Sequence, residues 1–311
     1  MKCAYCGEEK KATREHIISS GVLDLFPECY LTYDEHRGII HGADPFVKDT
    51  CSECNHDRIS YIDKYGKQFI EKYFLENYEK DAIVKIEYNY SMMQKLLLKY
   101  AYNDLRSKKD DISFFDNNIL DFLKDGNDNK PLTNITILGG LAIDTTPVPG
   151  FMFGNKKLRW CKSPKFLLNS FVENFDMETG IIYLRKNVEF AKFDGLLLSY
   201  MFRFNSGQFI LLCWDEEAGG LVENLDIIKN SYSYIILNQL ESSARLFRCT
   251  NETTYHLFGY IETSFEDSMM DAISRMRYKA SSSGRYYLDR LNEEWAKEEI
   301  LLSKEHERKH K

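Results

Sequence analysis

"CSECNHD", residues 51–57, contains two cysteines separated by two residues, and an asparagine follows the second cysteine directly. Beyond it, apolar residues recur at three- and four-residue spacing, which predicts a helix that begins near Ser52. The residues with this spacing are Ile59, Ile62, Phe69, Ile70, Tyr73 and Phe74. Asn55 would then lie in the first turn of the helix, beside the two thiols.

A second pair with the same spacing, Cys3 and Cys6, stands near the N-terminus, and 44 residues separate the two pairs. Each Cys-x-x-Cys loop presents two thiolates to one side, so Cys3, Cys6, Cys51 and Cys54 together match the tetrahedral ligand set of one zinc ion. Four thiolates leave no open position for water, and we therefore predict a structural Zn²⁺, one per chain. A chance arrangement in a cysteine-rich chain is the alternative.

The remaining cysteines are scattered, and the chain shows no sign of membrane insertion or export. No basic and apolar leader precedes Cys3, and the longest apolar runs, such as "FILLCW" at 209–214, are much shorter than a membrane span. We expect a cytoplasmic protein without a membrane partner, in which these thiols are reduced and buried as small apolar groups. They are Cys29, Cys161, Cys213 and Cys249.

Length and composition predict a folded protein with one large or two modest cores. The chain has 311 residues, of which 43% are hydrophobic, and its net charge is −7. Residues 1–80 alone carry 11 Lys and Arg against 15 Asp and Glu. Any surface for nucleic acid must therefore be local, and the first 80 residues should bind DNA poorly without help.

The pattern along the chain predicts an α+β protein in three segments: 1–80, a helical connector at 81–130, and a strand-rich α+β domain at 131–311. Helices are expected at 91–107, with Ser91 as the N-cap, and at 113–124. Short strands broken by Gly, Pro and Asn follow, as in "NITILGGLAI" at 134–143 and "GQFILLCW" at 207–214. Helical patterns return from Phe265 to the end of the chain. We expect the last segment to recognise a substrate, a partner or a signal.

Between the cysteine pairs lies "KKATREHIISSG", residues 10–21, in which Glu15 and His16 are adjacent. An acidic residue beside a histidine says little by itself, but the order of the whole set resembles that of the HNH endonuclease family, also called ββα-metal or His-Me finger nucleases, in its zinc-stabilised form. The set is Cys3, Cys6, Glu15, His16, Cys51, Cys54 and Asn55. Residues 94–105, "QKLLLKYAYNDL", are similar to a helix that often follows this nuclease module, so the resemblance covers about the first 125 residues.

The resemblance implies a role for each matching residue. One strand would end at Glu15 and His16, a second would lie near "FVKDT" at 46–50, and the helix would bring Asn55 to the same face. His16 would be the general base that takes a proton from the attacking water. Glu15 and the side-chain carbonyl of Asn55 would hold one divalent ion, Mg²⁺ or Mn²⁺, and cleavage would leave 5′-phosphate and 3′-hydroxyl ends.

Two features depart from the family pattern. Many members have Asp at the position of Glu15, and the middle asparagine that supports the base has no clear counterpart before Cys51; Asp44 and Asp49 are the candidates to replace it. His56 could contact phosphate or be a solvated side chain, and Asp63 could be catalytic or structural.

Two later stretches are basic with interleaved aromatic or apolar residues, at 154–165 and 275–290. They are candidate phosphate-binding surfaces, or else solvated loops and helix faces. The candidate contacts are Lys156, Lys157, Arg159, Arg275, Arg277 and Arg285.

The leading hypothesis is therefore a metal-dependent HNH endonuclease that hydrolyses DNA, with RNA as the open alternative substrate, and an effector role in bacterial restriction or anti-phage defence. A different class stays open, in which the zinc-bound cysteines support a non-enzymatic module for binding nucleic acid or protein. The third alternative is a nuclease subunit that is silent until a protein partner, or further copies of the chain, supply what it lacks.

Overall fold

The computed structural model describes, with side chains, residues 1–27, 44–79, 81–127, 130–142, 158–164, 166, 191–215, 224, 226 and 234–247. It also gives the backbone of short strands in the intervening ranges. The predicted helices beyond Phe265 and the candidate contacts Lys156, Lys157, Arg275, Arg277 and Arg285 lie outside the described residues.

The helices are α1 (Ser20–Leu23), the π-helix η1 (Glu53–Arg58), α2 (Ser60–Tyr73), α3 (Tyr90–Lys108) and α4 (Asn117–Lys124). The strands before α3 are β1 (Ala12–His16), β2 (Leu31–Asp34), β3 (Ile39–His41), β4 (Phe46–Cys51) and β5 (Val84–Glu87). Those after α4 are β6 (Ile135–Leu141), β7 (Met152–Phe153), β8 (Leu158–Lys162), β9 (Val172–Phe175), β10 (Ile182–Leu184), β11 (Leu196–Phe204), β12 (Gly207–Trp214), β13 (Ile235–Ile236) and β14 (Ser243–Leu246). The predicted α+β class is confirmed.

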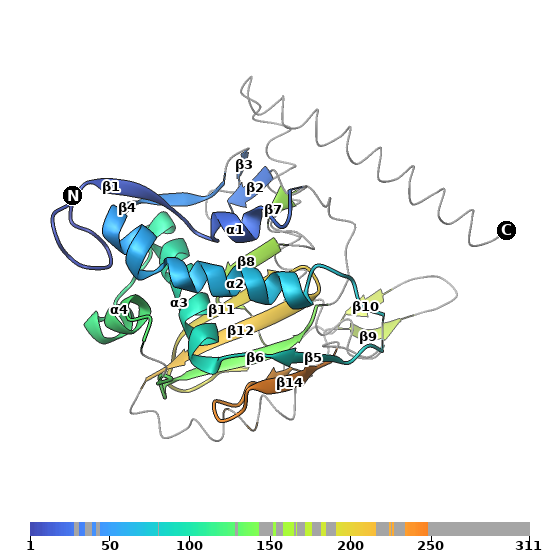
Figure 1. The fold of residues 1–311 in the computed structure, drawn as a ribbon. Helices are drawn as coiled ribbons and strands as arrows, with labels where there is room; N and C mark the ends of the chain where they lie inside the picture. The colour runs from blue at the N-terminus through green and yellow to red at the C-terminus, as the bar shows by residue number, and fades with distance from the viewer. Residues whose placement is uncertain are drawn as a thin grey trace.

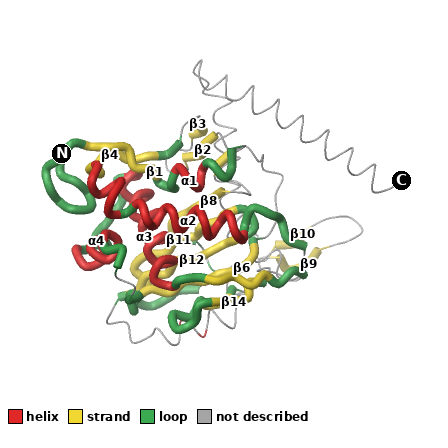
Figure 2. Tube along the Cα trace, viewed as in Figure 1, coloured by secondary structure: helices red, strands yellow, loops and turns green. Residues whose placement is uncertain are grey.

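An antiparallel sheet in the order β13-β6-β12-β11-β8 forms one layer, and α2 and α3 lie across one of its faces (Figure 1). The pair β5 and β14 runs beside this sheet, while the pair β1 and β4 lies on the far side of α3. Figure 2 shows the same arrangement, with the helices gathered on one side of the main strands.

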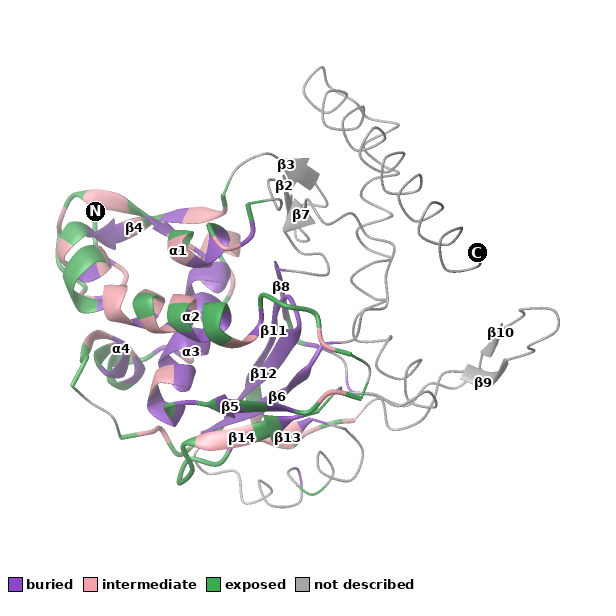
Figure 3. Cartoon of the chain, turned by 45° about the vertical axis from the view of Figure 1, so that its right-hand side comes forward, coloured by how far each residue is buried: buried purple, intermediate pink, exposed green. Residues whose placement is uncertain are grey.

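The central strands are apolar without interruption because both faces of the sheet are covered. In β12, Phe209 and Leu211 pack toward α2 and α3, while Ile210 and Leu212 belong to a second apolar cluster on the opposite face. Every residue of β12 is buried, as Figure 3 shows for the middle of the sheet. This explains why "GQFILLCW" is readable as a strand, although its residues do not alternate with polar ones.

The helix predicted at 91–107 is observed as α3, but it is the centre of the fold and not a connector. Its N-cap is Asn89, whose side chain accepts from the N–H of Met92, so the prediction of Ser91 as the N-cap is wrong. The helix is buried on nearly all sides because the sheet covers one side and the N-terminal elements cover the other. It packs closely on α2, where a Cβ at Gly66 would lie 2.5 Å from Leu96.

The N-terminal elements form a two-stranded ribbon followed by helix, which is the order that the resemblance implies. Strand β1 pairs antiparallel with β4, Glu15 lies opposite Val47, and His16 lies opposite Phe46. Directly after Cys51 the chain enters η1 and then α2. The predicted single helix from Ser52 is thus a π-helical turn joined to an α-helix.

One hydrophobic core contains residues from each of the three predicted segments, from Cys3 through Leu97 to Leu246. The first 80 residues therefore do not enclose their own core. Strand β8 lies within the basic stretch 154–165, which was expected to be on the surface. Strand β11 lies in a part of the chain for which no strand was predicted. Among the described residues, no helix has both the length and the hydropathy that crossing a bilayer requires.

Candidate functional site

The four predicted zinc ligands converge from three separate places in the chain. Cys3 and Cys6 lie in the N-terminal loop, Cys51 ends β4, and Cys54 lies in η1. Their sulfur atoms all lie within 4.8 Å of one another, and the Sγ atoms of Cys6 and Cys51 are 3.9 Å apart. Four ligands at the usual Zn–S distance would have sulfurs about 3.8 Å apart, so the cluster fits a zinc ion.

The backbone around the cluster is shaped for thiolates. The N–H of Cys51 donates to Cys3 Sγ at 3.3 Å, and the N–H of Cys54 donates to Cys51 Sγ at 3.5 Å. Burial raises the pKa of Cys3, but the backbone N–H groups around it outweigh burial and lower this pKa to about 7. The first loop turns at Gly7, whose φ of 72° is a conformation that favours glycine.

His16 ends β1 with its imidazole partly accessible. The ring is 30% exposed, and its Nε2 lies 3.7 Å from Oδ2 of Asp44. The main-chain carbonyl of His16 accepts a hydrogen bond from the side-chain amide of Asn103 at 2.8 Å. The residue predicted as general base is therefore fixed at its backbone by α3, while its ring remains open to solvent.

Asn55 is anchored on the same strand. Its Nδ2 donates to Oγ1 of Thr13 at 3.0 Å and to the main-chain oxygen of Arg14 at 2.8 Å. Both acceptor assignments are consistent, because the Thr13 hydroxyl donates to Thr50 O and a carbonyl can only accept. Among the described residues nothing donates to Asn55 Oδ1, which leaves this oxygen available as a ligand.

Glu15 does not face solvent with His16 and Asn55. Its side chain is 3% exposed, and its Oε1 lies 2.8 Å from Nζ of Lys99. The amide of Asn103 donates to the same Oε1 at 3.3 Å. The structure thus differs from the prediction that Glu15 shares a divalent ion with Asn55, because the carboxylate of Glu15 is buried against α3. An ammonium group binds this carboxylate instead.

A buried charge cluster links β1, α2 and α3. Lys99 is fully buried, and its Nζ donates to both carboxylate oxygens of Asp63 at 2.6 Å while also contacting Glu15. Burial disfavours the charged ammonium, yet the two carboxylates outweigh burial and raise the pKa of Lys99. Burial, together with the charge of Glu15, raises the pKa of Asp63.

Lys99 and Asn103 also belong to this site, although neither was predicted as a site residue. Both lie in "QKLLLKYAYNDL", the stretch that carries the resemblance in the connector, and their four-residue spacing places them on one face of α3. This spacing is the feature of the sequence that could have indicated a shared site. It is ambiguous, because polar residues four apart usually mark a solvated face of a helix.

The other candidate residues near the ribbon, Asp44, Asp49 and His56, each have different partners. Asp44 lies beside His16, whereas Asp49 forms an ion pair with Arg106 of α3. The Nδ1 atom of His56 lies 3.0 Å from Ser52 O and 3.1 Å from Ser52 Oγ, so this ring packs along its own helical turn. Of the two acids considered as replacements for the middle asparagine, only Asp44 is positioned to act on the base.

Only one of the predicted phosphate contacts falls among the described residues, and it is not on the surface. Arg159 is 2% exposed in β8, opposite Arg203 of β11. A phosphate could not reach its guanidinium in this arrangement. Lys162, at the end of the same strand, forms an ion pair with Asp110 at 2.9 Å.

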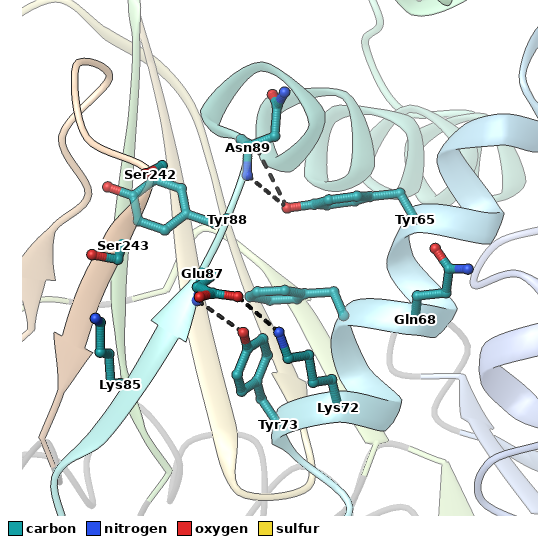
Figure 4. Close-up of a pocket in the computed structure, with 11 residues that line it drawn as sticks. Tyr65, Gln68, Lys72, Tyr73, Lys85, Glu87, Tyr88, Asn89, Ser242 and Ser243 are labelled. Carbon is teal, nitrogen blue, oxygen red and sulfur yellow. Dashed lines mark hydrogen bonds and ion pairs between the residues drawn. The ribbon is translucent and has the colours of Figure 1, made fainter.

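A hollow of about 580 Å³ lies between α2 and β5, and no residue of the β1–β4 ribbon lines it (Figure 4). The polar groups of α2 that face β5 are in part paired with that strand. The N–H groups of Glu87 and Asn89 donate to the hydroxyls of Tyr73 and Tyr65, and Lys72 binds the carboxylate of Glu87 at 2.9 Å. These contacts cap the free edge of β5, which is a structural role.

Comparison with known proteins gives no relative, since no protein-family model, no curated protein and no solved structure matches the chain. Its function has to be inferred from the geometry of its own residues.

Proposed function

We propose that the protein is a metal-dependent endonuclease of the HNH type that hydrolyses phosphodiester bonds in DNA. The observation that carries this proposal is the attachment of Asn55 to β1: its Nδ2 is bound by Thr13 and Arg14, and its Oδ1 is left open beside the strand that ends in His16. Two residues 39 positions apart are thereby held on one ribbon, next to a cysteine cluster that could hold zinc.

Each residue has a defined task in this proposal. The neutral imidazole of His16 takes the proton of the attacking water, since its ring is accessible and its backbone is fixed by Asn103. Asp44 faces Nε2 and would stabilise the imidazolium that forms. The water attacks phosphorus, the P–O3′ bond breaks, and the products carry 5′-phosphate and 3′-hydroxyl ends.

A divalent ion, Mg²⁺ or Mn²⁺, would supply charge stabilisation at the phosphate and the leaving oxygen when bound. The open oxygen of Asn55 fits such an ion, whereas the buried carboxylate of Glu15 does not fit as it stands. Glu15 could serve as a ligand only after exchanging Lys99 for the ion. We therefore assign Asn55 as a ligand of the divalent ion. Glu15 becomes a ligand only if the ion replaces Lys99 beside its carboxylate.

The burial of Glu15 also favours a second function, a module without enzymatic activity. Glu15 is neutralised by Lys99, and the amide of Asn55 bonds to the backbone, so both residues also have structural tasks. This is what a non-enzymatic zinc-bound module for nucleic acid or protein would show. A nuclease subunit that a partner must activate, for example in bacterial defence, would show the same contacts. In its activated state, Glu15 would bind the divalent ion in place of Lys99.

The test is cleavage of supercoiled plasmid DNA and of a single-stranded RNA by the full chain, with added Mg²⁺ or Mn²⁺. The His16→Ala variant should lose roughly 10²- to 10⁴-fold in rate and retain its zinc. His56→Ala is the matched control, because this neighbouring histidine packs on its own helical turn, and it should cleave at the parental rate. Equal cleavage by the His16→Ala variant and the parental protein would refute the assignment. No cleavage by the parental protein with either metal would favour the non-enzymatic module.

A further inference from the structure

Two cations converge on one aromatic ring of the β1–β4 ribbon. The guanidinium carbon of Arg14 lies 5.0 Å from the centre of the Phe46 ring, and Nζ of Lys48 lies 5.6 Å from it. Both are cation–π distances, so the ring holds two long and otherwise flexible side chains near one place.

This place is on the same face of the ribbon as His16. Phe46 is the strand partner of His16, and side chains alternate between the two faces of a strand. Glu15 and Val47 are buried toward the helices, so their neighbours Arg14, His16 and Phe46 project to the opposite face. The ladder is irregular opposite Lys48, and it is the contact of its Nζ with the Phe46 ring that places this side chain on the same face. Arg14 and Lys48 therefore lie together on one side of the proposed general base, one step along the ribbon from the pair of His16 and Phe46.

The charges of Arg14 and Lys48 are not neutralised within the described part of the chain. No described carboxylate lies within ion-pair distance of either, although the N-terminal cations Lys10 and Arg58 are both paired with Glu53. Asp49, the acid next to Lys48 in the sequence, is bound by Arg106 on the other side of the ribbon. The face of the ribbon that carries His16 thus keeps two free positive charges in a segment whose overall balance is negative.

We propose that Arg14, Phe46 and Lys48 form a phosphate-binding surface for the backbone of a nucleic acid, which places the scissile strand across His16. The inference rests on the proposed function and names the substrate contact of that same site. Two cations on the exposed face of the ribbon suit consecutive phosphates of a polymer, and the aromatic ring lowers the entropy that each side chain loses on binding. This surface replaces Arg159 as the nucleic-acid contact.

The test is equilibrium binding of a 20-base-pair duplex and of a 20-nucleotide single strand to the full chain, without added divalent ion and as a function of salt. The double variant Arg14→Gln/Lys48→Gln should reduce the slope of log affinity against log salt by roughly 0.9 per lost contact on duplex. The matched control is Lys85→Gln/Arg245→Gln. It removes two exposed cations from the paired strands β5 and β14, far from the ribbon, and should keep the parental slope.

Measuring binding and cleavage separately distinguishes a failure of this inference from a failure of the proposed function. Loss of slope in the ribbon variant alone supports the surface, even if the parental protein cleaves nothing. A parental slope in the ribbon variant overturns the surface, even if the protein is a nuclease. Equal losses in both double variants, or no binding of nucleic acid by the parental protein, would also overturn it. Polyglutamate serves as a non-nucleic polyanion, and tighter binding of polyglutamate than of either nucleic acid would assign the surface to acidic proteins and overturn the proposal.

Discussion

The side-chain amide of Asn103 donates to the carbonyl oxygen of His16 at 2.8 Å, so helix α3 holds the strand that carries the proposed general base. The next residue, Asp104, faces the other way and accepts from the hydroxyl of Tyr200 at 2.9 Å and from the indole of Trp160 at 3.0 Å. Two adjacent residues of one helix therefore connect the ribbon to the main sheet. The ribbon depends on α3 for its position, which predicts that residues 1–80 alone should cleave poorly.

Asn103→Asp should disturb the base without removing the acceptor that Tyr5 uses. The variant loses the donor to His16 O and Glu15 Oε1, but its carboxylate still accepts from the hydroxyl of Tyr5. Because a small displacement of a catalytic group is costly, kcat for DNA cleavage should fall by roughly 10- to 100-fold with little change in KM. Steady-state kinetics measure this, and Asn118→Asp on the exposed side of α4 is the control. A rise in KM at constant kcat would contradict a positioning role.

Lys99→Met should destabilise the fold strongly. It leaves the buried carboxylate of Glu15 and the partly buried carboxylate of Asp63 without their shared cation, and breaking a buried ion pair costs about 3–5 kcal/mol. Urea unfolding measures the free energy. Adding Glu15→Gln should restore part of the loss, since one of the two uncompensated charges is removed.

The control for this charge cluster is Lys64→Met, which changes an exposed lysine of α2 and should alter the free energy of unfolding by less than about 0.5 kcal/mol. If Lys99→Met and Lys64→Met were equally stable, the cluster would not contribute to the fold.

The purified protein should contain one zinc ion per chain, and Cys54→Ser should abolish its binding, because the remaining three thiolates no longer complete a tetrahedral site. Cys213→Ser is the matched control: Cys213 is as buried as Cys54 but lies in β12, and this variant should retain zinc. Metal analysis by mass spectrometry decides between them. Zinc at the parental level in Cys54→Ser, or folded parental protein without zinc, would remove the basis of the site.

The hydroxyl of Tyr90 should contribute to stability in full below pH 10 and lose this contribution at higher pH. Burial raises the pKa of its hydroxyl, which donates to Ile135 O at 3.0 Å, to about 12 in the folded protein, against 10.0 for an ordinary tyrosine. The folded state therefore holds the proton more tightly than the unfolded state. The contribution of Tyr90 is fully present below pH 10 and is lost as pH rises from 10 through 12.

A shift of this size corresponds to a contribution on the order of 2–3 kcal/mol. The free energy of unfolding of Tyr90→Phe should lie below the parental value at pH 9, and the difference should shrink by pH 11.5, as urea titrations at both pH values can measure. A difference that stays constant over this range would show that the hydroxyl does not titrate with unfolding.

The sequence by itself determined the local features that depend on spacing. The cysteine pairs and the helix now seen as α3 could be read from residues a few positions apart, because ligand geometry and secondary structure repeat over short intervals. Asn55 beside Cys54 was readable for the same reason. The strand ending at His16 and the strand over "FVKDT" were expected from the resemblance to a known family.

Only the tertiary structure decided which faces these elements bury. Arg159 looked like a surface cation because its neighbours in sequence are basic, yet its strand lies in the main sheet and the side chain is buried. Lys99 and Asn103 looked like part of a connector, yet they meet Glu15 from more than 80 positions away. Burial depends on which distant segment covers a face, and a buried charge persists only where such a segment brings its partner. For that reason the pairing of Glu15 with Lys99 could not be read from the chain.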